Sequence, residues 1–212
     1  MSRIVPSPPL ALPEPNLLTL PAGSTLHRVH AAQFDGTAFN PCLGRPTRFA
    51  PIADRAGGCV ASLYAGSTLR AAIFETIFHD IPAKAPLRTV PKHEVTSRMH
   101  SILRTEAALT LVELRTPDLA KWGLEHQELI SAPADQYERT APWAAAIHHQ
   151  FAGVEGLVWT SNRCDPDSAY LFFGDRIGAE AFAALSVREG RSEGFLADVR
   201  EAGLRAGIAI TI

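Results

Sequence analysis

The sequence predicts a single domain of the α+β class. Predicted strands and helices follow one another in mixed order, without the regular alternation that is typical of a doubly wound parallel sheet. The chain has 212 residues, which is enough to bury a core without help from disulfides or a metal. No internal repeat is visible, so we expect one structural unit rather than an array.

The composition is that of an ordinary globular protein. Apolar residues make up 46% of the chain and charged residues 20%, and no apolar run approaches the length of a membrane span. A formal charge of −2, without a basic run, does not indicate a protein that binds nucleic acid through its phosphates. We therefore expect a soluble protein that contacts neither a membrane nor nucleic acid directly.

The cysteines and the N-terminus both indicate the cytoplasm. Cys42, Cys59 and Cys164 are odd in number and widely scattered, which predicts neither a disulfide framework nor a zinc site. The first twenty residues lack a basic start followed by an unbroken apolar stretch, so no secretion signal is predicted. Five prolines between Ser2 and Pro21 predict that residues 1–22 form an extended strap over a domain of residues 23–212.

The first half of the domain is predicted to hold two strands, a long loop and a helix. Thr25–Ala32 reads as a strand that carries Arg28 on one face, because side chains alternate between the two faces of a strand. The segment 33–56 has no sustained period and predicts a long loop, which in a compact domain is often a binding loop. A strand at 60–65 then leads into a helix over 69–79, with Ser67 as the expected N-cap.

Glu75 is the unusual residue of that helix. Its neighbours make the helix apolar on nearly all sides, which predicts burial, and a buried carboxylate is costly unless it is paired or used. One interpretation is a structural ion pair with an arginine. The other is a functional carboxylate.

The second half of the chain is richer in strands. Ser168–Phe173 and Gly156–Ser161 flank a polar turn and predict a hairpin. The other predicted elements are a strand at 108–115, a helical turn at 118–123, a helix within 137–150, a helix at 195–203 and a closing strand at 208–212.

Most familiar catalytic motifs are absent from the sequence. His27 and His30 would point to opposite faces of a strand, and His148 and His149 have no acidic residue at a ligand-like spacing, so we predict no metal site. His79, which precedes an aspartate, is read as a cation at the C-terminal end of the helix. The chain has no nucleophile elbow and no glycine-rich phosphate loop.

Four segments together resemble the RES domain family, which is named for an arginine, a glutamate and a serine. They are Leu26–His30, Thr47–Pro51, the stretch Ser62–Asp80, and Gly156–Arg163. The resemblance covers about residues 25–175. It implies an ADP-ribosyltransferase-like fold of small mixed β-sheets flanked by helices.

The resemblance also implies the residues of a site. The family arginine corresponds to Arg28, a second arginine to Arg48, the tyrosine to Tyr64, the glutamate to Glu75 and the serine to Ser161. Glu75, Arg28 and Ser161 would then be catalytic, while Arg28, Arg48, Tyr64 and Ser161 would bind NAD, with no metal required. The loop around the second arginine departs from many members, because Thr47 replaces a glycine and Ala50 a polar residue.

The implied activity is cleavage of NAD between nicotinamide and ribose. Nicotinamide leaves as a neutral group, so one carboxylate can suffice where an O-glycosidase needs two. The acceptor stays open between water, phosphate and a protein side chain, which would make the chain a glycohydrolase, a phosphorylase or an ADP-ribosyltransferase. A binding module of the same fold without turnover is the alternative class.

Family members typically act as toxins that deplete NAD and are held by an antitoxin. The resemblance therefore implies a partner protein with an Xre-like helix-turn-helix region. It also allows a homodimer of this chain within a toxin–antitoxin complex.

Overall fold

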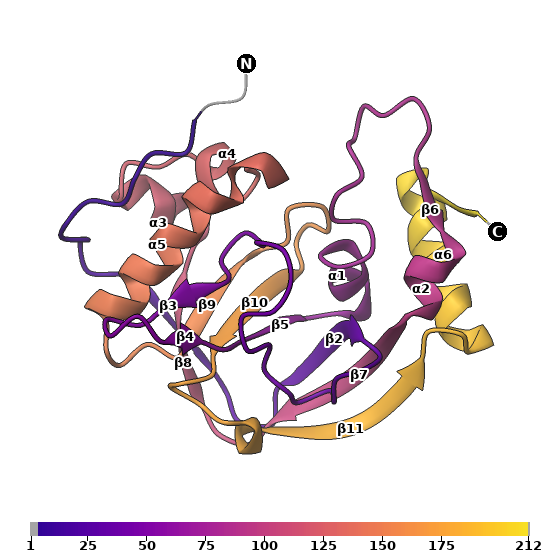
Figure 1. Ribbon diagram of the computed structural model, residues 1–212, viewed down its shortest axis with the longest axis horizontal. Coiled ribbons are helices and arrows are strands. Elements are labelled where there is room, and N and C mark those ends of the chain that lie inside the picture. Colours follow the sequence, from indigo (N-terminus) through magenta and orange to yellow (C-terminus); the bar gives the residue numbers. More distant parts are fainter. Residues whose placement is uncertain (1–3, 212) are drawn as a thin grey trace.

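A computed structural model of the protein describes residues 4–211 (Figure 1). Its centre is one curled, eight-stranded sheet of order β1-β8-β9-β10-β5-β2-β7-β11, in which only the β8–β9 pair is parallel. The strands of this sheet are β1 (Leu17–Leu20), β2 (Thr25–Ala31), β5 (Ser62–Gly66), β7 (Arg98–Thr105), β8 (Leu109–Glu113), β9 (Gly156–Thr160), β10 (Ser168–Phe173) and β11 (Phe182–Glu189). Two small sheets pair β3 (Ile52–Ala53) with β4 (Cys59–Val60) and β6 (Thr89–Pro91) with β12 (Ala209–Thr211).

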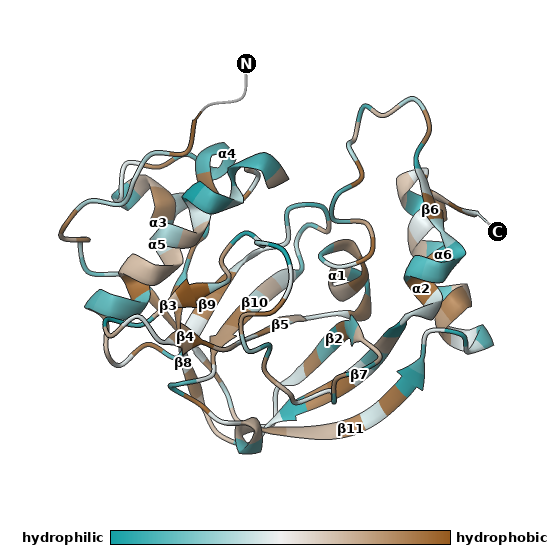
Figure 2. Ribbon diagram, in the orientation of Figure 1, coloured by the Kyte–Doolittle hydropathy of each residue, from teal (hydrophilic) through white to brown (hydrophobic). Residues whose placement is uncertain are grey.

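The helices gather at two ends of the large sheet (Figure 1). One group covers the β8–β9 end, another lies near β6, and α1 (Leu69–Phe74) stands between them. The first group is α3 (Thr116–Lys121), α4 (His126–Leu129) and α5 (Tyr137–Gln150), and the second is α2 (Lys92–Thr96) and α6 (Glu193–Ala206). Figure 2 shows hydrophobic β3 beside α5, in agreement with their contacts. No helix in the described part of the chain is long and apolar enough to cross a lipid bilayer.

The mixed strands and helices of the α+β prediction are present, but the sheets differ from those expected. One large sheet replaces several small ones, because β1, β7 and β11 extend it and the sequence analysis had not identified them. β11 is an edge strand whose side chains are mostly exposed, so it lacks the alternation of apolar and polar residues that marks a half-buried strand. β1 lies in the proline-rich segment, where strand pairing was not expected, and it pairs with β8.

The helix that carries Glu75 is shorter than predicted. It begins after Thr68, whose side chain accepts a hydrogen bond from the Ala71 N–H, so the N-cap is Thr68 and not Ser67. It ends at Glu75, which is the C-cap. The next residues are β-branched and weak helix formers, and the turn they form buries Phe78 against Phe74, with ring centroids 5.3 Å apart.

The cysteine prediction was wrong for one pair. Cys42 and Cys59 form a disulfide that ties the long loop to β4. The odd cysteine count concealed this pair, because Cys164 remains as a buried free thiol. The two cysteines are 17 residues apart and meet only because the loop folds back. No local sequence pattern predicts that fold.

Four other predicted elements agree closely with the structure. β10 spans the predicted residues, β9 ends one residue early, and the two pair as the expected hairpin. α5 also covers the whole predicted range and contains Pro142 in its interior. The closing strand is β12, and Ile212, which the prediction included, lies outside the described residues.

The N-terminal strap packs into the domain. Val5 and Leu12 are buried in the core cluster beneath α5. The indole N–H of Trp143 donates to the Pro6 carbonyl oxygen at 2.7 Å, and that of Trp122 donates to Pro13 at 3.0 Å. Residues 1–3 of the predicted strap lie outside the described residues, and the boundary between residues 22 and 23 stays a prediction.

We expect the strap to contribute to stability through its buried side chains. Leu12→Ala should lower the free energy of unfolding by about 2–4 kcal/mol, since it removes a buried leucine from the core. Leu10→Ala, in the same strap, removes a fully exposed leucine and should change it by less than about 0.5 kcal/mol. Urea unfolding of both variants measures the difference. Equal effects would show that the strap does not pack on the core.

Candidate active site

A cleft of about 820 Å³ lies between the sheet, the long loop and the first turn of α5. Three of the five residues predicted for the site, Arg28, Tyr64 and Glu75, line this cleft. Ser161 and Arg48 contact Glu75 from behind the cleft wall. The structure thus brings all five predicted residues into one region, but only three of them line its open space.

Three donors fix the Glu75 carboxylate. Its Oε1 accepts hydrogen bonds from the Ser161 hydroxyl at 2.7 Å and from the Asn162 backbone N–H at 3.0 Å. Its Oε2 lies 3.4 Å from Arg48 Nη1. The glutamate side chain is 13% exposed, so it meets the cleft with its orientation already set.

Arg48 is held in the wall by several contacts. Its guanidinium carbon lies 5.7 Å from the centroid of the Tyr137 ring, and its carbonyl oxygen accepts a hydrogen bond from the Thr140 hydroxyl. The side chain is 4% exposed and its Nε has no hydrogen-bond partner. The Arg48–Glu75 contact is therefore a sheltered ion pair, in which each charge depends on the other for compensation.

Arg28 lies on β2 and, unlike Arg48, is held by backbone carbonyl oxygens. Its Nη1 donates to the carbonyl oxygens of Gly36 at 2.6 Å and Ala38 at 2.7 Å, and no carboxylate among the described residues pairs with it. Burial lowers the pKa of Arg28 to about 10, which still leaves the guanidinium protonated at neutral pH. The cleft wall thus carries an uncompensated positive charge that is suited to an anion.

Tyr64 joins the cleft wall to the loop that carries Arg48. Its hydroxyl oxygen accepts from the Phe49 N–H at 3.1 Å and lies 2.9 Å from the Thr47 hydroxyl. Burial raises the pKa of Tyr64 to about 12, so the phenol stays neutral at physiological pH. The tyrosine therefore supports Arg48 through the loop while its ring lines the cleft.

Two further side chains of the cleft were missed by the sequence analysis. His79 Nε2 lies 2.7 Å from the Tyr137 hydroxyl, and His79 Nδ1 lies 2.7 Å from Asp80 Oδ1. The prediction that His79 is a cation at a helix end was wrong, because the helix ends four residues earlier, at Glu75. Burial lowers the pKa of His79, which favours its neutral form. The pairing with Tyr137 spans 58 residues, and no spacing rule would indicate it.

The remaining histidines make contacts with other side chains. His30 Nε2 lies 2.8 Å from the Ser101 hydroxyl, and His148 Nε2 lies 2.8 Å from Asp175 Oδ2. Among the described residues, no group of three or more His, Cys, Asp or Glu side chains is arranged to hold a metal ion.

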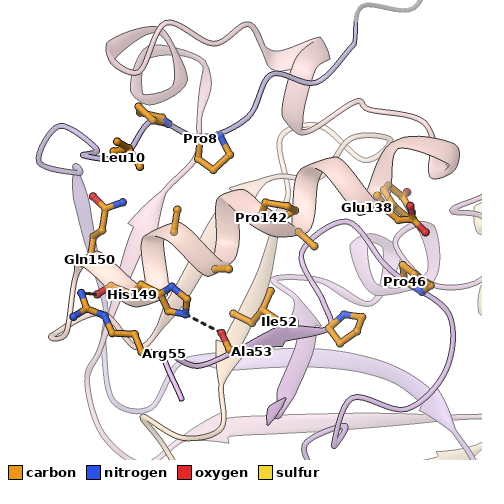
Figure 3. Close-up of a pocket in the computed structure, with 16 residues that line it drawn as sticks. Pro8, Leu10, Pro46, Ile52, Ala53, Arg55, Glu138, Pro142, His149 and Gln150 are labelled. Carbon is orange, nitrogen blue, oxygen red and sulfur yellow. Dashed lines mark hydrogen bonds between the residues drawn. The ribbon is translucent and has the colours of Figure 1, made fainter. Parts of the chain in front are cut away.

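A second cavity, of about 780 Å³, runs along α5 and the strap (Figure 3). Its walls are mainly prolines and alanines, together with Ile52 and Leu10. None of the five predicted residues lines this groove, although Pro46, Tyr137 and Glu138 border both cavities. Arg55, Glu138 and His149 also line this groove, but the Glu75 carboxylate and Arg28 line only the cleft.

Comparison with known proteins places the chain in a family. No curated protein matches the sequence. The fold is similar to a chain in the crystal structure of the M. tuberculosis MbcT–MbcA toxin–antitoxin complex, with a TM-score of 0.61 and 13% identity over 86% of this chain and 92% of that one. The RES domain family matches residues 25–191, a range that contains all five predicted residues. The protein therefore belongs to the RES domain family.

Proposed function

We propose that this protein cleaves NAD at the bond between nicotinamide and ribose and acts as the toxin of a toxin–antitoxin pair. The observation that carries the proposal is the fixed Glu75 carboxylate in a cleft that also holds the uncompensated charge of Arg28. An ADP-ribosyltransferase-like fold is part of the same proposal.

Glu75 would stabilise the charge that develops during bond cleavage. When the C–N bond breaks, its electron pair moves to the pyridinium nitrogen, and nicotinamide leaves as a neutral molecule. The ribosyl carbon becomes positively charged, and a carboxylate beside it lowers the energy of that state. An oxygen of the acceptor then bonds to the same carbon and releases its proton to solvent.

The arginines would take separate roles. Arg28 can bind the NAD diphosphate, since it lines the cleft and has no acidic partner in the part of the chain that the structure describes. The earlier expectation that Arg48 also binds the diphosphate stays a prediction, but its contact with Glu75 favours a positioning role. Ser161 would orient the same carboxylate, and Tyr64 would supply a ring surface for nicotinamide or ribose.

The position before Glu75 favours a small acceptor over a protein side chain. Arginine-directed transferases often keep a glutamate or glutamine two residues before the catalytic glutamate, and Ile73 stands there in this chain. Ile73 is 1% exposed and packs in the core. Water or phosphate would thus be the acceptor, while protein ADP-ribosylation and a binding module without turnover are the competing functions.

An antitoxin would control this activity in the cell. The structural relative comes from a toxin–antitoxin complex, and a cytoplasmic enzyme that drains NAD needs an inhibitor. We propose a small partner with an Xre-like helix-turn-helix region that covers the cleft, with a homodimer of this chain as a possible arrangement within the complex. An acidic group of that partner would complement Arg28.

Replacement of Glu75 tests the catalytic assignment. Glu75→Gln keeps the size of the side chain and removes its charge, so nicotinamide release from NAD should fall by at least about 100-fold. Glu106→Gln, on an exposed turn outside the cleft, is the matched control and should retain full activity. Near-normal release from a folded Glu75→Gln protein would refute the catalytic role.

Replacement of the arginines separates binding from positioning. Arg28→Lys should weaken NAD affinity about tenfold in calorimetry, because lysine lacks the planar fork. Arg48→Lys should mainly reduce the rate of nicotinamide release, because it disturbs the ion pair to Glu75. An equal loss of affinity in both variants would instead place Arg48 on the diphosphate.

The toxin role is tested by expression in a bacterial host. Expression of the chain alone should arrest growth and lower cellular NAD, and co-expression of a neighbouring helix-turn-helix gene should relieve both effects. The Glu75→Gln variant, expressed at the same level, should be harmless. Growth without arrest by a chain that cleaves NAD in vitro would favour a metabolic role.

A further inference from the structure

A third cavity, of about 600 Å³, lies beside α1, and none of the residues that line it also lines the cleft. Four segments border it, namely α1, the segment before β6, the β9–β10 turn and the end of α6. Figure 1 shows the last three around α1. Each of these segments contributes one arginine, namely Arg70, Arg88, Arg163 and Arg205. We call this cavity the arginine pocket.

The arginine pocket carries an excess of positive charge. Asp165 is the one acidic residue that lines it, and Asp167 pairs with Arg70 from outside the lining, so four arginines against two aspartates leave two positive charges. Arg70 pairs with Asp167 at 3.4 Å. No carboxylate among the described residues pairs with Arg88, Arg163 or Arg205. Such an excess is unusual in a chain whose formal net charge is −2.

Backbone contacts hold two of these arginines in place. Arg88 donates through Nη1 to the Ala206 carbonyl oxygen, and Arg163 donates through Nη1 to that of Ile81. These acceptors are uncharged, so the contacts orient the guanidinium groups without neutralising them. Arg88 Nε is buried and has no hydrogen-bond partner among the described residues. Burial and then the charge of Arg88 lower the pKa of Arg163, and the nearby Glu75 and Asp80 carboxylates oppose that shift in part.

We propose that the arginine pocket binds a small molecule that carries a diphosphate. Guanidinium groups are the usual ligands of phosphate oxygens, and three of them from separate elements can surround one diphosphate. The volume lies within the range of small-molecule sites, and Phe74, Ala83 and Ala206 add an apolar wall. This site is separate from the cleft, and its existence does not depend on NAD cleavage.

The pocket also shares a wall with the active site. The backbone N–H of Asn162 donates to Glu75 Oε1 at 3.0 Å, while Asn162 itself lines the arginine pocket. A ligand bound to Arg163 would therefore contact the same turn that fixes the catalytic carboxylate.

Calorimetric titration of the full chain with pyrophosphate, at low ionic strength, tests the proposal. The titration uses the Arg28→Lys protein, whose cleft should bind a diphosphate weakly, so that the arginine pocket gives one saturable site. Adding Arg205→Gln or Arg163→Gln should each weaken that binding about tenfold. Arg205 is exposed, so its replacement does not endanger the fold. Arg200→Gln removes an exposed charge from the same helix outside the pocket and should change the affinity less than twofold.

A parallel titration with ADP separates two sources of the diphosphate. Tighter binding of ADP than of pyrophosphate would identify a nucleotide as the ligand, and equal binding would identify the diphosphate alone. Unchanged pyrophosphate affinity in both Arg205→Gln and Arg163→Gln would overturn the proposal, since it would place the anion elsewhere. An equal loss in Arg200→Gln would overturn it too, because the attraction would then be nonspecific.

Discussion

The arrangement of this site depends on how one partly buried carboxylate is compensated. Glu75 stands where α1 ends, and three donors from two distant segments meet it there. Removing Arg48 or the β9–β10 turn would leave a sheltered negative charge without its partners, which is costly in a protein interior. Several features of the surrounding loops serve to keep those donors in place.

The long loop shows how one of these donors, Arg48, is kept in place. It has little regular structure of its own, yet it delivers Arg48 to Glu75 because it is tied down at several points. The Tyr64 hydroxyl accepts from the Phe49 N–H, the Thr140 hydroxyl donates to the Arg48 carbonyl oxygen, and the Cys42–Cys59 disulfide anchors the loop to β4. A binding loop positioned by a rigid scaffold combines a precise geometry with freedom to vary in sequence.

The β9–β10 turn connects the two charged cavities of the molecule. On one side its Ser161 and Asn162 hold the catalytic carboxylate of the proposed reaction, and on the other its Arg163 faces the arginine pocket. The hairpin that carries this turn lies in the middle of the large sheet, where both strands are paired on both sides. The turn is thus rigidly supported although it is itself irregular.

The sequence by itself determined the local elements and drew attention to Glu75. Alternation and helical spacing predicted β2, the β9–β10 hairpin and α5, because these signals depend only on neighbouring residues. An acidic residue on an apolar helix singled out Glu75, and the resemblance to the RES family supplied its companions. Only the tertiary structure decided the order of the eight strands, the early end of α1, the disulfide and the position of Arg48 behind Glu75. Those features depend on contacts between residues far apart in the chain, and no periodic pattern records such contacts.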